Sequence, residues 1–122
     1  MPRSPKQVAV LVPLPILYDE DKHGVRKSIE DEKFWQTLKE VNEKFDATLH
    51  WNGATGIWKY AGCPVKDDIH LLAAVIRDTS SNREWWRRYA KRVLCNRFIQ
   101  KAIFITFVRV KAELIWNERI QR

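Results

Sequence analysis

The stretch Val8-Ala9-Val10-Leu11-Val12, at residues 8–12, is apolar at every position and rich in β-branched side chains. Such a run is typical of a strand that is buried on both faces. The runs Ile69–Ile76 and Ala102–Val108 have nearly the same character. We therefore predict three main strands that are apolar on both faces. The length of 122 residues is typical of one domain, so we expect a single domain over residues 1–122.

Two helices are predicted between these strands. The first has Ser28 as its expected N-cap, acidic residues in its first turn and residues 46–47 at its end. The second begins near Ser81, whose spacing to Glu84 is that of a capping box. Apolar side chains recur at helical spacing in both. These stripes are Phe34, Leu38, Val41 and Phe45 in the first helix, and Trp86, Tyr89, Ala90, Val93 and Leu94 in the second.

A hairpin is predicted before the second main strand. Residues 48–51 and 57–60 have the composition of strands, and Asn52-Gly53 between them suits the positive φ angles of a tight turn. The prolines at positions 13 and 15 lack the N–H that a strand ladder uses. The end of the first strand is therefore expected to be irregular, bulged or unpaired on one side.

The order of elements is strand, helix, strand with its hairpin strand, strand, helix, strand. This is the split βαβ pattern, so we predict an α+β, ferredoxin-like sandwich. Its antiparallel sheet carries two helices on one face and an extra hairpin strand. Right-handed crossovers make the strands at residues 8–12 and 69–76 neighbours in the sheet.

The second face of this sheet needs a cover. Two helices bury one face, and a bare apolar face would exceed the few hundred Å² that monomers usually expose. We therefore predict a homodimer that joins two such faces by twofold symmetry. The alternative is that residues 57–60, or the tail Leu114–Ile120, fold across the face within one chain.

A further set of residues resembles a family of small uncharacterised bacterial α+β proteins. The resemblance runs from Phe34 to Phe104, and its main motifs are Gly56-Ile57-Trp58 and Arg97-Phe98-Ile99-Gln100. No activity is established for that family, so the resemblance implies a fold and no reaction. A more distant resemblance is to dimeric α+β barrels, which pair two bare sheet faces and sometimes hold a ligand between them. The remaining matching positions are Phe45, Thr48, Gly62, Tyr89 and Ile103.

The net charge of +7 is concentrated near the carboxyl end, where residues 82–122 carry 11 basic and 3 acidic side chains. Such a surface attracts nucleic acid or another anionic partner. The outer side of the second predicted helix combines arginine with an indole, which suits phosphate contact and base stacking. The alternative is a solvated face whose tryptophan shields the core. The candidate residues are Trp85, Arg87, Arg88, Lys91 and Arg92.

Acidic residues and histidine lie at the ends of two strands predicted to be neighbours. Carboxylate and imidazole groups together suit Mg²⁺ or Mn²⁺, as in a small metal-dependent hydrolase or nuclease. The alternative is that these are turn residues, neutralised by Arg97 or Lys101. The candidate metal ligands are Asp19, Asp21, Asp68 and His70.

No widespread catalytic motif is present: there is no phosphate-binding glycine loop, His-Glu-x-x-His, Cys-x-x-Cys or Gly-x-Ser-x-Gly. The sequence thus assigns no catalytic residue or cofactor and leaves open whether the protein is an enzyme. Two cysteines 32 positions apart, Cys63 and Cys95, suit a reducing cytoplasm. No signal peptide or membrane span is expected. We predict a cytoplasmic, dimeric binding or assembly module, with nucleic-acid binding and metal-dependent hydrolysis as alternatives.

Overall fold

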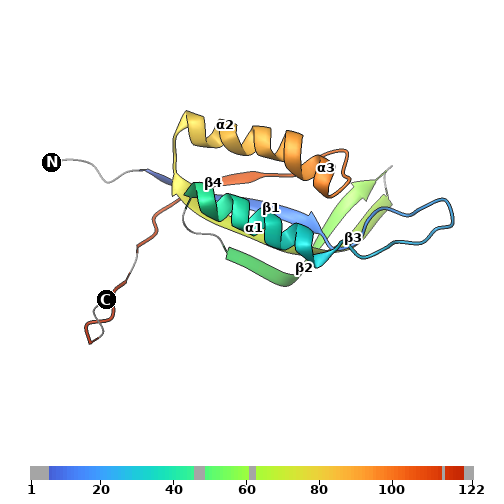
Figure 1. The fold of residues 1–122 in the computed structure, drawn as a ribbon, viewed down its shortest axis with the longest axis horizontal. Coiled ribbons are helices and arrows are strands. Elements are labelled where there is room, and N and C mark those ends of the chain that lie inside the picture. Colours follow the sequence, from blue (N-terminus) through green and yellow to red (C-terminus); the bar gives the residue numbers. More distant parts are fainter. Residues whose placement is uncertain (1–5, 46–48, 61–62, 114, 120–122) are drawn as a thin grey trace.

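The computed structural model of the chain describes residues 6–45, 49–60, 63–113 and 115–119, and for residues 49–60 and 63–68 it describes the backbone alone. One antiparallel sheet has the strand order β2-β3-β1-β4. The helices lie together on one side of it (Figure 1). This arrangement confirms the predicted ferredoxin-like α+β fold. In chain order the elements are β1 (Gln7–Pro15), α1 (Asp31–Phe45), β2 (Leu49–Tyr60), β3 (Cys63–Arg77), α2 (Ser80–Tyr89), the π-helical segment η1 (Ala90–Leu94), α3 (Cys95–Arg97) and β4 (Thr106–Val110).

Strand β1 occupies the centre of the sheet, as its sequence predicts. Its side chains alternate between fully buried and half-buried positions along the whole strand. The buried set faces the helices, because it belongs to one cluster with the buried residues of α1, α2 and η1. The fully buried positions of β1 are Val8, Val10, Val12 and Leu14.

The two prolines of β1 limit its pairing on one side. The ladder with β3 continues from Gln7 to Pro15, whereas the ladder with β4 ends at Leu11, opposite Thr106. Pro13 and Pro15 have no N–H to donate to a ladder, and the end of β1 is unpaired on one side, as predicted. Residues 102–105 have no strand structure, so the strand predicted at Ala102–Val108 begins only at Thr106, as β4.

The predicted hairpin at Asn52-Gly53 is wrong. Strand β2 runs through these residues and pairs with β3 on both sides of a register shift between Trp51 and Ala54. An Asn-Gly pair suits a β-bulge as well as a turn, because both use unusual backbone angles. The chain reverses instead between Tyr60 and Cys63, which are partners in the β2–β3 ladder. The sheet therefore has one long edge strand where an extra hairpin strand was predicted.

Both predicted helix caps are displaced. Ser28 forms an isolated β-bridge with Leu17, and α1 begins three residues later. Ser81 lies inside α2, whose N-cap is Thr79. The Thr79 hydroxyl oxygen accepts a hydrogen bond from the Asn82 backbone N–H at 3.1 Å, which satisfies one free donor of the first turn. The capping residue thus follows β3 almost directly.

A π-helical segment, η1, shifts the apolar stripe of the second helix. The Cys95 N–H bonds to the Ala90 carbonyl five residues earlier, so η1 holds one more residue per turn than an α-helix. Of the two core residues predicted in this turn, Leu94 is fully buried and Val93 is only half-buried. Phe98 is fully buried after α3. Among the described residues, no helix is long and apolar enough to span a membrane.

We expect Val10→Ala to lower the free energy of unfolding by about 2 kcal/mol, because it removes fully buried methyl groups from β1 and leaves a cavity. Val25→Ala is the matched control, since Val25 lies in a loop and is 51% exposed; its effect should stay within about 0.5 kcal/mol. Urea unfolding of both variants measures the difference. Equal effects would contradict the assignment of Val10 to the core.

Candidate functional site

The basic face of α2 and η1 is exposed, whereas its tryptophan packs against neighbouring aromatic rings. Arg87, Arg88, Lys91 and Arg92 are all exposed. The half-buried Trp85 ring stacks on Tyr89, with ring centroids 4.6 Å apart, and its edge contacts Phe45 and Trp86. Trp85 therefore packs on the aromatic core, as the alternative interpretation of the sequence had it.

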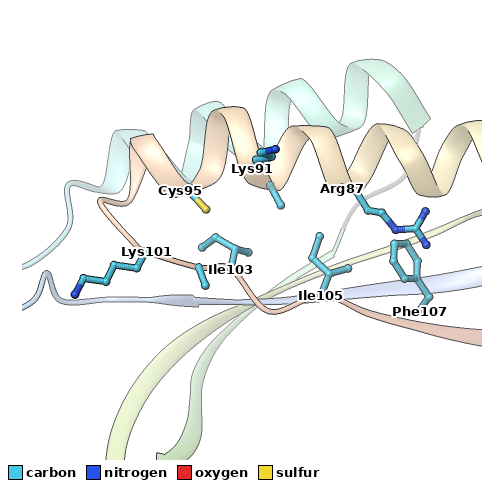
Figure 2. Close-up of a pocket in the computed structure, with 9 residues that line it drawn as sticks. Arg87, Lys91, Cys95, Lys101, Ile103, Ile105 and Phe107 are labelled. Carbon is cyan, nitrogen blue, oxygen red and sulfur yellow. The ribbon is translucent and has the colours of Figure 1, made fainter. Parts of the chain in front are cut away.

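A groove of about 440 Å³ separates this helix from the chain that leads into β4 (Figure 2). Lys101 lies at one end of the groove, Arg87 and Phe107 lie at the other, and Ile103 and Ile105 form the floor between them. The nine lining residues include three cations and no carboxylate. They are Arg87, Ala90, Lys91, Cys95, Lys101, Ala102, Ile103, Ile105 and Phe107.

The aromatic end of the groove is fixed by two guanidinium groups. Arg83 and Arg87 lie over the Phe107 ring, at 5.1 and 5.6 Å from its centroid. Arg83 is neutralised by Asp78, through hydrogen bonds of 2.6 and 3.1 Å. Arg87 has a longer, exposed contact of 3.5 Å to Glu84. Within the described chain, neither Lys91 nor Lys101 forms an ion pair, so these two lysines carry the uncompensated charge of the groove.

Sequence reasoning did not identify this groove. Arg87 and Lys91 were assigned to an outward face of the helix, and Lys101 was considered only as a partner for the acidic residues. The available signal was the alternation of Ile103, Ile105 and Phe107, which places all three on one face of an extended segment. That this face lies opposite the cations depends on the helix position, which the sequence alone does not give.

The candidate metal ligands have varied surroundings. Asp21 closes its own loop, since its Oδ1 accepts hydrogen bonds from the backbone N–H groups of His23 (2.8 Å) and Val25 (3.0 Å). Asp19 is exposed. The His70 ring stacks on Phe34 of α1, with centroids 4.2 Å apart.

Strands β1 and β3 are neighbours as predicted, with Leu14 opposite His70. The side chain of Asp68 lies outside the described residues. In the described part of the chain, no three His, Cys, Asp or Glu side chains come close enough together to hold a metal ion. Arg97, considered as a partner for the acidic residues, binds Glu40 instead. Metal-dependent hydrolysis at this edge stays a prediction.

A half-buried polar network joins α1 to α2 and α3. Arg97 contacts Glu40 Oε1 at 2.8 Å and donates a hydrogen bond to Thr37 Oγ1 at 2.9 Å. The Tyr89 hydroxyl donates to Glu40 Oε1 at 2.7 Å. Burial alone would raise the pKa of Glu40, but the hydrogen bonds from Tyr89 and Arg97 outweigh it and hold that pKa below its usual value. Burial and the bond to Glu40 raise the pKa of Tyr89 above its usual value.

The outer sheet face, opposite the helices, is apolar and uncovered in the described chain. Cross-strand rows form on it, because Ala9 is paired with both Val75 and Val108, and Leu11 with both Ala73 and Thr106. Val75 is 36% and Val108 41% exposed.

Two segments of the same chain were considered as covers for this face, and neither covers it in the described residues. Residues 57–60 pair with β3 inside the sheet, so they do not cross its face. In the tail, Ile115 and Trp116 are 80% and 73% exposed, and the chain there runs away from the sheet (Figure 1). The face therefore needs a partner, or stays exposed to water.

We expect Glu40→Gln to make stability less dependent on acid pH. A carboxyl group whose folded pKa is depressed stabilises the fold above its unfolded pKa, near 4.5, and that contribution is lost as the pH falls through the folded pKa. Urea unfolding at a series of pH values should show a shallower loss of stability for Glu40→Gln below about pH 4.5. Glu43→Gln is the control, because Glu43 is exposed on the same helix. Equal pH dependence in both variants would contradict the role of Glu40.

Comparison with known proteins gives a fold and no family. No family model matches the chain, and no curated protein matches its sequence. Among solved structures, it is similar to the divalent cation tolerance protein Cut A1 from Thermus thermophilus. The TM-score is 0.61 at 15% sequence identity, over 88% of this chain and 87% of that one. At this identity the likeness shows a shared fold alone, and it supports the ferredoxin-like architecture described above.

Proposed function

We propose that the protein is a homodimeric binding module in which two copies join their outer sheet faces. The observation that carries this proposal is the apolar face of β1, β3 and β4, which no described segment of the chain covers. Burial of such a face stabilises an assembly by about 25 cal/mol for each Å² of apolar surface removed from water. In a twofold pair neither apolar face stays exposed to water, because each copy covers the face of the other.

A second copy is favoured as the occupant because the face is self-compatible. Its described central side chains, including Ala9, Leu11, Ala73, Val75 and Val108, carry no charge. Pairing two identical faces therefore opposes no like charges at the centre, where repulsion would be strongest. Arg77 lies at one end of β3, and a twofold axis that lies between the two faces and runs across the strands would place its two copies at opposite ends of the interface.

Pairing through the outer sheet faces leaves the helical surfaces of both copies accessible to a binding partner. The helices and the groove lie on the opposite side of the sheet from the paired faces. Each dimer then presents two basic helical faces and two grooves to solvent, with one shared core of apolar sheet between them. Paired sites of this kind increase apparent affinity for a partner that reaches both.

Light scattering tests the proposal. We expect the unmodified protein to have twice the 14.5 kDa mass of one chain at micromolar concentration. The double variant Val75→Lys with Val108→Lys should have the mass of one chain, because four lysines would meet in the interface. Val25→Lys makes the same change at an exposed loop position and should stay dimeric.

Two results would overturn the dimer. A single-chain mass for the unmodified protein would show that the face is exposed to water, and a mass of three or more chains would exclude twofold pairing. Both results come from the unmodified protein, so they stand even if the double lysine variant fails to fold.

A second candidate function is binding of single-stranded nucleic acid on the basic face. It is favoured by the exposure of Arg88 and Arg92, neither of which forms an ion pair with a described residue. The role given to Trp85 is left out of this candidate, since its ring packs on Tyr89 and Phe45. Recognition would then rest on phosphate contacts, which are strongly weakened by salt.

We expect Arg88→Ala with Arg92→Ala to weaken binding of a single-stranded oligonucleotide and to lower the salt slope by about one or two. Fluorescence anisotropy over a range of salt concentrations measures both quantities. Lys39→Ala with Lys44→Ala removes the same charge from α1 and serves as the control. Absence of binding by the unmodified protein at low salt would exclude this function.

A further inference from the structure

The groove between the second helix and residues 101–107 has the chemistry of a ligand site, independently of the dimer interface. Its floor is aliphatic, formed by Ile103 and Ile105 on the helix side of the extended chain. Its rim is cationic, with Lys91 on η1 and Lys101 at the far end. A volume of about 440 Å³ lies within the range of small-molecule sites, which combine apolar walls with a few polar anchors.

The charges around the groove favour an anion. Arg83 is neutralised by Asp78, and Glu84 contacts Arg87, so the acidic groups near the groove lie at its aromatic end. Lys91 and Lys101 have no carboxylate partner among the described residues. Both side chains are exposed, and each places an uncompensated positive charge on the rim, where it attracts a negatively charged headgroup.

The apolar floor favours an aliphatic chain over a nucleobase. A base would need acceptors for its amino groups, and the lining side chains supply none stronger than the Cys95 thiol. The one aromatic ring of the lining, Phe107, is already covered by Arg83 and Arg87. An alkyl chain needs no hydrogen-bond partner and gains free energy from burial against the two isoleucines.

We propose that this groove binds a single-chain amphiphile, with its aliphatic chain on Ile103 and Ile105 and its anionic headgroup at the cationic rim, to which Lys91 and Lys101 both contribute. The Cys95 side chain points from the helix toward Ile103 (Figure 2), so the thiol lies against the bound chain. The site lies on the helix side of the sheet, and binding therefore does not depend on the pairing of the outer faces.

Calorimetry with octyl phosphate tests the proposal. We expect octyl phosphate to bind at least tenfold more tightly than inorganic phosphate, which lacks the chain, and than octanol, which lacks the charge. Lys91→Gln with Lys101→Gln should weaken binding at least tenfold. The control is Lys22→Gln with Lys27→Gln, which removes the same charge from exposed loop positions and should bind as the unmodified protein does.

A second measurement reports on the groove directly. In a Cys63→Ser background, octyl phosphate should slow alkylation of the Cys95 thiol, and inorganic phosphate should not. This readout locates the ligand and does not require the double lysine variant to fold.

Four results would overturn the proposal. Equal affinity for octyl phosphate and inorganic phosphate would mean a simple anion site, and equal affinity for octanol would mean an uncharged apolar site. Equal loss in the groove variant and the loop control would mean diffuse attraction by the net charge. Binding to phosphatidylglycerol vesicles without binding to octyl phosphate would place recognition on a membrane surface.

Discussion

The central strand β1 has apolar side chains on both faces, and each face imposes a separate demand on the rest of the chain. Val8, Val10 and Val12 are fully buried beneath the helices, and that face alone accounts for the two-layer sandwich. The other face includes Ala9 and Leu11, which lie in apolar rows with the neighbouring strands. Within the described chain, only the face toward the helices is covered. The uncovered face is the physical reason for expecting a second copy.

The sequence predicted those features that depend on hydrophobic pattern, and missed those that depend on competition between neighbouring segments. Runs of β-branched residues located β1 and β3, and the order of strands and helices gave their adjacency. Asn52-Gly53 was wrongly predicted to form a turn, because the same backbone freedom also suits a bulge. Pairing of β2 with β3 on both sides of these residues favours the bulge. Ser28 failed as a cap because its backbone pairs with Leu17. Such outcomes follow from tertiary contacts that one sequence does not encode locally.

The candidate site shows the same division. The concentration of basic residues was visible in the sequence, but which of them act together was not. The π-helical segment adds one residue to a turn, and this shift buries Leu94 while the half-buried Arg97 contacts Glu40. Helical spacing alone, which assumes a regular α-helix, predicted both Val93 and Leu94 in the core. The groove depends on how residues 101–107 lie against the preceding helix, which the sequence alone does not give.

Pro13 and Pro15 have a further consequence for how copies of this chain meet. An exposed sheet edge with free N–H donors is a template for another strand, and it leads to open-ended aggregation. If the β1–β4 register continued past Leu11 and Thr106, Pro13 would lie opposite Phe104 and Pro15 opposite Ala102. Neither proline has an N–H to donate, which makes the stretch of β1 beyond β4 a poor template for a further strand. Growth along a sheet edge has no natural limit, whereas the proposed pairing of the outer faces is complete after one partner.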